Sequence, residues 1–243
     1  MASTQVGRIK HIYRYPVKGM RGEELDTAEL SWHGLQGDRR YALAARGDHS
    51  GFPWLSGRLK AQLISYTPVF EKPEEPNSSS IEVTTPQGEC FPLKGGALLH
   101  ELETLFEKPL ELIKLNRGCF DSATISLISQ NTLDSIGAAV GETLGPRRFR
   151  PNVFMELDDQ GSYPEDAWLG KRLQIGEAAD APLVQIDRQN VRCVMINIEP
   201  HTVAKNPEVL KYVTQKREQC AGVYASPVRT GQLVQGAPIF LLD

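Results

Sequence analysis

The amino-acid sequence predicts a mainly β protein with a few helices, which is an α+β fold. Short segments with strand-like alternation recur along the chain, glycines and prolines separate them, and only three segments have helical periodicity. The chain has 243 residues, of which 40% are hydrophobic, so it can bury one large core or two smaller ones. Short strands at this spacing are typical of a β-barrel or a β-sandwich.

The first strand is predicted at residues 6–15. Ile9, His11 and Tyr13 fall on one face, basic residues lie on the other, and Pro16 ends the segment. The same reasoning predicts further strands at Leu25–Trp32, Arg40–Ala45, Gln62–Tyr66, Ile81–Thr85, Leu110–Leu115, Asn152–Leu157, Arg172–Ile175, Leu183–Ile186, Val191–Ile198 and Ile239–Leu242.

Three helices are expected. The apolar residues of 98–106 and of 133–144 recur at helical spacing, and Ser129 or Asn131 is the expected cap of the second helix. The third has the clearest signals, because Asn206 is a good cap and Pro207 suits the first helical position. Gly222 is expected just beyond its end.

Composition excludes several classes of protein. Lys and Arg number 27 against 30 Asp and Glu, giving a net charge of −3, so a nucleic-acid binder is not expected. The four cysteines form no CxxC pair, which argues against a zinc site or a disulfide scaffold. Neither a secretory signal nor a run of about 18 apolar residues is present, so we expect a cytoplasmic protein without membrane contact. Phosphate-loop, dinucleotide-binding, zinc-protease and serine-hydrolase motifs are absent too.

Cys193 is the candidate metal ligand. Within the predicted strand Val191–Ile198, it shares the less apolar face with Met195, directly after Arg192. A thiol beside an arginine can have a lowered pKa and bind a metal as a thiolate. The commoner alternative is that it is a small buried apolar residue, as most free cysteines are.

Several cations lie at the ends of predicted strands. Lys18 follows the first strand, Arg39 precedes the third, and Arg150 ends the basic run 147–150. Guanidinium groups suit phosphate because they form paired hydrogen bonds with it. Since the whole chain is slightly acidic, these cations favour a small phosphorylated ligand over a polymer. Each could also be an ordinary solvated residue.

In these segments the sequence resembles the MOSC-domain proteins, the superfamily of the molybdenum cofactor sulfurase C-terminal domain. It is most similar to the branch that has an N-terminal MOSC β-barrel region and includes the mitochondrial amidoxime reducing component. The motifs that carry the resemblance are 15–19, 37–41, 127–133, 148–152, 165–170, 192–200, 222–226 and 231–238. The resemblance implies a MOSC-type barrel packed with a smaller N-terminal β-rich region, at residues 116–243 and 1–115 respectively.

The resemblance also implies a molybdenum cofactor, in which a molybdopterin carries the metal. Cys193 would bind molybdenum and be the catalytic residue, while Lys18, Arg39 and Arg150 would hold the phosphate and the pterin ring. Further hydrogen bonds to the cofactor are expected from Ser129, Gln130, Asn131, Thr132 and Asn152. Gly19 stands where the family often has a serine, which removes one hydroxyl contact.

The activity implied is reduction of small N-hydroxylated or N-oxygenated compounds. The chain has no CxxxxCxxC motif, so electrons are expected from an external protein of the ferredoxin, flavodoxin or cytochrome b5 type with its reductase. The first alternative is a carrier or sulfur-handling protein that binds the cofactor without turnover. A more remote one is a domain that binds a phosphorylated ligand and has lost the metal. No lysine stands out as a Schiff-base residue for pyridoxal phosphate.

Overall fold

The computed structural model describes residues 3–242, and strands dominate it, which confirms the α+β prediction. The strands are β1 Ser3–Arg14, β2 Glu23–Leu25, β3 Thr27–Ser31, β4 Gly34–Leu35, β5 Tyr41–Ala45, β6 Thr67–Phe70, β7 Ile81–Thr84, β8 Cys90–Pro92, β9 Leu110–Lys114, β10 Ile125–Ser129, β11 Val153–Leu157, β12 Arg172–Ile175, β13 Leu183–Val191, β14 Cys220–Arg229, β15 Gly231–Val234 and β16 Pro238–Leu242. The helices are α1 Gly96–Phe106, α2 Gln130–Val140, α3 Pro146–Phe149 and α4 Pro207–Arg217, with 3₁₀ helices η1 Ala61–Ser65, η2 Pro164–Trp168 and η3 Val194–Asn197.

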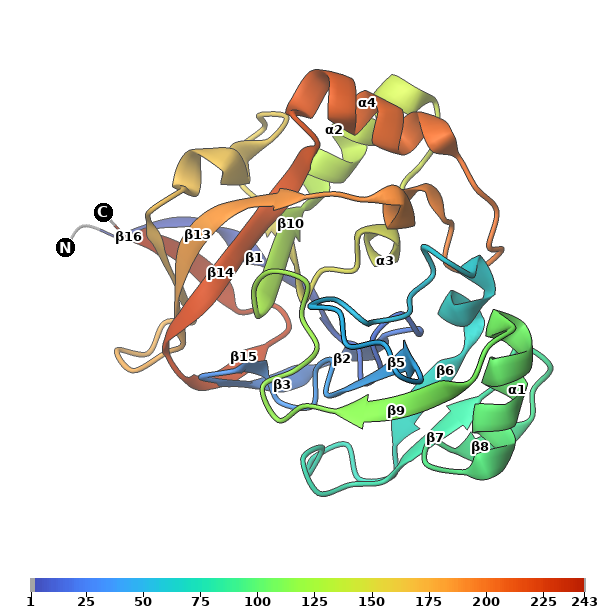
Figure 1. Ribbon diagram of the computed structural model, residues 1–243. Coiled ribbons are helices and arrows are strands. Elements are labelled where there is room, and N and C mark those ends of the chain that lie inside the picture. The colour runs from blue at the N-terminus through green and yellow to red at the C-terminus, as the bar shows by residue number, and fades with distance from the viewer. Residues whose placement is uncertain (1–2, 243) are drawn as a thin grey trace.

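The largest sheet closes into a barrel (Figure 1). Its strand order is β11-β10-β14-β13-β12-β16-β1-β2, and β1, the last strand but one, also pairs with β11, which closes the sheet on itself. Closure leaves few unpaired strand edges, and apolar side chains such as Ile9, Leu127 and Ile186 fill the interior. Since β1 is part of this barrel, the barrel extends across the expected division near residue 115.

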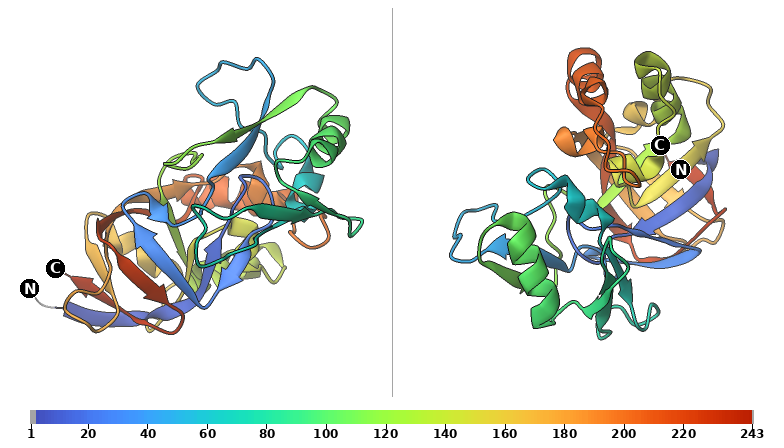
Figure 2. Two further views of the ribbon diagram at one scale, coloured as in Figure 1. Left: turned by 90° about the horizontal axis from the view of Figure 1, so that it is seen from below. Right: turned by 90° about the vertical axis from the view of Figure 1, so that its right-hand side faces the viewer.

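The remaining strands form three small sheets. Sheet β6-β7-β8, the pair β5-β9 and helix α1 surround a second apolar core that includes Phe70, Val83 and Leu102. Figure 2 shows that this lobe is separated in space from helices α2 and α4. The third small sheet, β15-β3-β4, joins a strand near the C-terminus to two from the first 40 residues.

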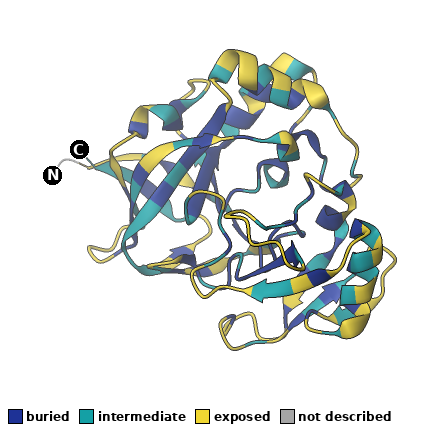
Figure 3. Cartoon of the chain, in the orientation of Figure 1, coloured by how far each residue is buried: buried dark blue, intermediate teal, exposed yellow. Residues whose placement is uncertain are grey.

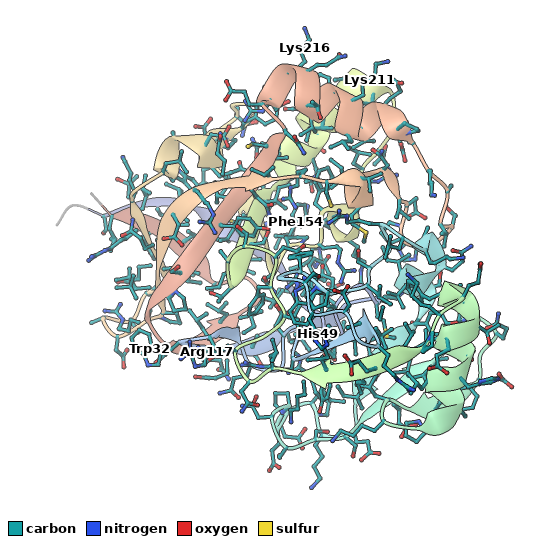
Figure 4. All side chains as sticks on the ribbon, viewed as in Figure 1. Trp32, His49, Arg117, Phe154, Lys211 and Lys216 are labelled. Atoms are coloured by element: carbon teal, nitrogen blue, oxygen red, sulfur yellow. The ribbon has the colours of Figure 1, made fainter. Side chains whose placement is uncertain are left out.

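Helices α2 and α4 pack on the outside of the barrel through a third core with Ile136, Val209 and Val213. Their predicted caps are confirmed. The Thr132 N–H donates to Ser129 Oγ at 3.1 Å, and the Glu208 N–H donates to Asn206 Oδ1 at 3.0 Å. Lys211 and Lys216 project from the outer face of α4 (Figure 4). None of the helices within residues 3–242 is long and apolar enough to cross a membrane.

Two predicted strands are wrong. Residues 62–66 belong largely to the 3₁₀ helix η1, whose Leu63 and Ile64 pack into different cores. The predicted strand Val191–Ile198 is only the end of β13 followed by η3. Helix α4 also ends before Gly222, at Arg217, because Glu218 takes a left-handed conformation with φ of 50°.

Strand β10 escaped prediction because all five of its side chains are buried (Figure 3). A strand buried on both faces shows no alternation of polar and apolar residues. Its position matters for function, because it lies between β11 and β14 beside the site described next.

Candidate functional site

A cavity enclosing about 120 Å³ brings together five of the residues predicted to bind a cofactor, namely Lys18, Arg39, Arg150, Asn152 and Cys193. Its lining includes residues of α3, of the turn that follows β13 and of the N-terminal segment 18–58. Its other charged lining residues are Arg58, Arg148, Arg192 and Asp121. Six cations against one carboxylate make this a site for an anionic ligand.

Cys193 lies at the end of β13, where the chain leaves the barrel and enters η3. Gln219 holds this turn, because its backbone oxygen accepts the Arg192 N–H at 2.8 Å and its Nε2 donates to the Arg192 oxygen at 2.7 Å. The Cys193 side chain is partly exposed at the cavity wall. The thiol therefore combines a fixed backbone with access to a ligand.

Arg148 supports the 3₁₀ helix η3 from a distant part of the chain. Its Nη1 donates to the backbone oxygens of Ile196 and Asn197, both at 3.4 Å. Its Nη2 pairs with Glu142, and Leu210 donates its N–H to Asn197 Oδ1 at 2.9 Å. Because long-range side chains satisfy the polar groups of η3, the segment needs no neighbouring strand.

Arg39 and Arg150 lie against the same buried ring, that of Tyr15. The guanidinium carbons are 4.5 Å and 4.2 Å from its centroid, respectively. Burial raises the pKa of Tyr15 to about 12, so its hydroxyl stays neutral at physiological pH. Asp38, which is fully buried, pairs with Arg39 and accepts the Tyr15 N–H at 2.7 Å. These contacts fix one arginine and support the other.

Both arginines also have unusual backbone conformations. Arg39 has φ of 49° and Arg150 has φ of 54°. Residues other than glycine rarely adopt this left-handed region, and such strain is common at binding sites. At Arg150 this conformation also ends helix α3, as it does at Glu107 and Glu218 at the ends of α1 and α4.

Among the residues that line the cavity, Arg150 has a buried side-chain nitrogen without a hydrogen-bond acceptor. Its Nη2 is buried and donates to no group in the part of the chain that the structure describes. Burial lowers the pKa of Arg150 to about 10, which leaves it charged at neutral pH. A buried donor without an acceptor costs folding free energy, and among the residues that line this cavity Nη2 of Arg150 is such a donor, so it can bind an acceptor that a ligand supplies.

Lys18 also lines the cavity and is held by two acceptors. Its Nζ donates to the Cys119 backbone oxygen at 2.7 Å and pairs with Asp121. Burial lowers the pKa of Lys18, and Asp121 partly offsets that effect. The Asp121 side chain is 56% exposed, so it can move away when another anion binds Lys18.

Replacing Asp121 with asparagine should therefore strengthen anion binding. Lys18 then loses a competing carboxylate, and a charge pair whose acidic partner is exposed to solvent is worth about 1 kcal/mol, or about fivefold in affinity. Titration of the cofactor-free protein with pyrophosphate measures the change. Glu74→Gln removes the same charge from an exposed loop and should leave the affinity unchanged; equal affinities of Asp121→Asn and the unsubstituted protein would contradict the competition.

Asn152 lines the cavity but its amide is occupied by the protein. Its Nδ2 donates to the Tyr13 oxygen at 3.2 Å, and its Oδ1 accepts the Ser126 N–H at 3.2 Å and Arg39 Nη1 at 3.4 Å. These bonds join β1, β10 and Arg39. Its geometry is that of a residue which positions Arg39.

The structure places Ser129, Gln130, Asn131 and Thr132 outside the lining of this cavity. Ser129 and Thr132 are buried against Glu165, whose carboxylate accepts both hydroxyl groups at 2.6 and 2.7 Å. Gln130 Nε2 donates to Asp134, and Asn131 Nδ2 donates to the Asp159 and Gly161 backbone oxygens. These contacts support the start of α2, so we leave all four out of the candidate site.

Two glycines allow the N-terminal segments to approach the cavity closely. At Gly19, with φ of 85°, an added Cβ would lie 2.8 Å from Leu63 Cδ2 and 3.1 Å from Ser56 Cα. At Gly57 it would lie 3.0 Å from Met195 Sδ. A side chain larger than hydrogen would therefore not fit at position 19, where the resemblance led us to note the missing serine hydroxyl. At position 57 the absence of a side chain lets the segment with Arg58 approach the turn of Cys193.

Sequence reasoning missed Arg58, Asp121 and Arg192 as part of the site. The guanidinium of Arg192 is buried, with Nε donating to the Ala221 oxygen at 2.7 Å and Nη1 to the Phe149 oxygen at 2.8 Å. Burial lowers its pKa to about 10. Only its position beside Cys193 could have drawn attention to it, and Arg58 and Asp121 lie in loops with no distinctive pattern.

Within residues 3–242, no three His, Cys, Asp or Glu side chains are arranged to hold a metal ion. The cavity instead offers one thiol and several cations. Such a donor set fits a metal that arrives bound to an anionic organic cofactor and takes one sulfur ligand from the protein.

Comparison with known families gives two matches. The profile of the MOSC domain matches residues 115–240, and that of the MOSC N-terminal beta barrel domain matches residues 6–94. The first covers more than half of the chain and contains Cys193 and Arg150. No curated protein matches the chain.

Solved structures support the fold alone. The YuaD protein from Bacillus subtilis is 13% identical, with a TM-score of 0.50, over 99% of this chain and 97% of that one. YiiM from Geobacillus stearothermophilus is 20% identical over 50% of this chain and 55% of its own, with a TM-score of 0.38. YiiM from Escherichia coli is 14% identical over the same shares, with a TM-score of 0.37.

Proposed function

The chain belongs to the MOSC-domain family, and we propose that it binds a molybdenum cofactor in the cavity of Arg150 and Cys193 and reduces N-hydroxylated compounds with it. The observation that carries this proposal is the buried, unpaired Nη2 of Arg150 in a cavity that also presents a thiol. The guanidinium of Arg150 can bind an anion, and the thiol of Cys193 can bind a soft metal.

The cofactor's two ends have different requirements, and the chain meets both. Arg150, Arg39 and Lys18 would hold the phosphate and the pterin, since all three are cations whose side chains line one enclosed space. Cys193 would hold molybdenum, because its thiol is the only one lining the described cavity. The enclosed part is smaller than most ligand pockets, so part of the cofactor would extend beyond it.

When bound, molybdenum supplies the electrons that cleave an N–O bond. Reduction of an N-hydroxyl group consumes two electrons and two protons and releases water. The protein's part is to fix the orientation of the cofactor through Arg39 and Arg150 and to place the metal at a partly exposed position beside Cys193. Asp38 and Asn152 act as positioning residues by holding Arg39.

We propose that the electrons come from a separate protein. The sequence lacks a CxxxxCxxC motif, and its four cysteines are dispersed among β8, the segment before β10, the start of η3 and β14. We propose a small external donor of the ferredoxin, flavodoxin or cytochrome b5 type.

The decisive experiment is the reduction of benzamidoxime to benzamidine by cofactor-loaded protein with a reduced viologen dye. We expect turnover that depends on loading, with cofactor-free protein as the control. Loaded protein that fails to turn over, yet transfers its cofactor to a cofactor-free acceptor enzyme, would overturn the reductase and establish the carrier.

A further inference from the structure

A second hollow of about 290 Å³ adjoins the cofactor cavity on the side of Cys193. We call it the outer groove, and its lining residues are Phe52, Arg58, Asp121, Ser122, Arg188, Gln189, Val191, Arg192, Cys193, Gln219 and Tyr224. Seven of these also line the cofactor cavity, whereas Ser122, Arg188, Gln189 and Gln219 line the groove alone. A molecule in the groove would thus lie next to the metal side of the cavity.

Apolar side chains are exposed along the outer groove. Phe52 is 44% exposed and Val191 is 63% exposed, and the ring of Tyr224 lies nearby in the lining. Lys18 Nζ lies 5.6 Å from the centroid of the Phe52 ring, which helps to hold that ring over the opening. Large apolar groups exposed around a hollow indicate contact with a flat apolar ligand.

The groove also has an excess of positive charge. The backbone N–H of Arg58 donates to Ser56 Oγ at 3.3 Å, but its guanidinium makes no hydrogen bond or ion pair with any described residue. Arg188 donates through Nη2 alone, to Ser122 Oγ at 2.7 Å and the Ser122 oxygen at 3.0 Å. The one carboxylate in the lining, Asp121, is paired with Lys18. In a chain with a net charge of −3, two accessible arginines beside a paired acid form a local anion site.

We propose that the outer groove binds the substrate and favours aromatic N-hydroxylated compounds that carry a carboxylate. The aromatic ring would lie against Phe52 and Val191, the carboxylate would bind Arg188 and Arg58, and the N-hydroxyl group would face the side of Cys193. This inference rests on the proposed reductase activity, but it assigns the groove through binding, which can be measured without turnover.

The test compares 4-carboxybenzamidoxime with its 4-carbamoyl analogue, which has nearly the same shape and no charge. Calorimetric titration of the cofactor-free protein at low salt should show about tenfold tighter binding of the carboxylate, as expected for a charge-assisted hydrogen bond. Arg188→Gln should reduce that ratio to about one, and 0.5 M salt should reduce it too. Arg58→Gln provides a second variant, and Arg46→Gln, which removes an exposed arginine from the N-terminal lobe, should keep the ratio.

Equal affinity for the two compounds in the unsubstituted protein would overturn the inference, as would a preference that survives both Arg188→Gln and Arg58→Gln. Either result leaves the proposed function standing if loaded protein reduces benzamidoxime. Conversely, selective binding of the carboxylate without reduction of either compound would keep the anion site and overturn the reductase.

Discussion

Replacing Cys193 with alanine should lower the affinity for molybdenum by at least about 100-fold, because loss of even an outer supporting partner of a metal costs 10- to 100-fold. The turn that carries Cys193 is held by backbone and Gln219 contacts that do not involve the thiol. Alanine should therefore leave the fold intact and remove only the sulfur ligand. Reduction of N-hydroxylated compounds should fall at least as far.

Metal analysis of protein loaded with cofactor measures the first effect, and X-ray absorption at the molybdenum edge counts the remaining sulfur ligands. Cys90→Ala is the matched control, since Cys90 is an exposed thiol on β8 and lies outside both the cavity and the groove. Equal molybdenum content and equal numbers of sulfur ligands in Cys193→Ala and Cys90→Ala would show that Cys193 does not bind molybdenum.

Much of the barrel could be predicted from the sequence. Strands such as β12 and β16, and the caps of α2 and α4, follow from local patterns that the structure keeps. The family resemblance implied a barrel, but the strand pairs that close it could not be predicted from local patterns, because β1 pairs with both β11 and β16, which lie more than 140 residues away. No short-range pattern encodes a pairing over that distance.

In the site, too, some residues could be predicted from the local sequence and others depend on distant parts of the chain. Lys18, Arg39 and Arg150 are recognisable as cations at strand ends, and they do meet in one cavity. The surroundings of Cys193 could not be predicted from local patterns, since the carbonyls of Ile196 and Asn197 in η3 accept from Arg148, which lies almost 50 residues earlier in the chain. Residues 129–132 carry a helix-cap signal, and the structure uses them for that purpose.

Replacing Arg150 with methionine should weaken cofactor retention by about 10- to 100-fold, because a hydrogen bond to a charged group contributes about 1.5–3 kcal/mol. The effect on the cofactor-free protein should have the opposite sign. Nη2 of Arg150 is buried without a partner, and burial lowers the pKa of the group to about 10, so the charged form destabilises the empty fold. Methionine retains the Cβ and much of the length, so it leaves the left-handed backbone strain unchanged.

Arg147→Met is the matched control from the same short helix. Arg147 donates to the Gly22 oxygen at 2.8 Å and pairs with Glu24, and it does not line the cavity. The Arg147→Met variant should be less stable and keep the cofactor. The Arg150→Met variant should lose the cofactor and have an unchanged or higher melting temperature. In a protein of this size 1 kcal/mol corresponds to about 2–4 °C, so calorimetry of both cofactor-free variants resolves the difference. A fall of about 5 °C or more in Arg150→Met, with cofactor retention equal to that of Arg147→Met, would show that Arg150 serves the fold and not the ligand.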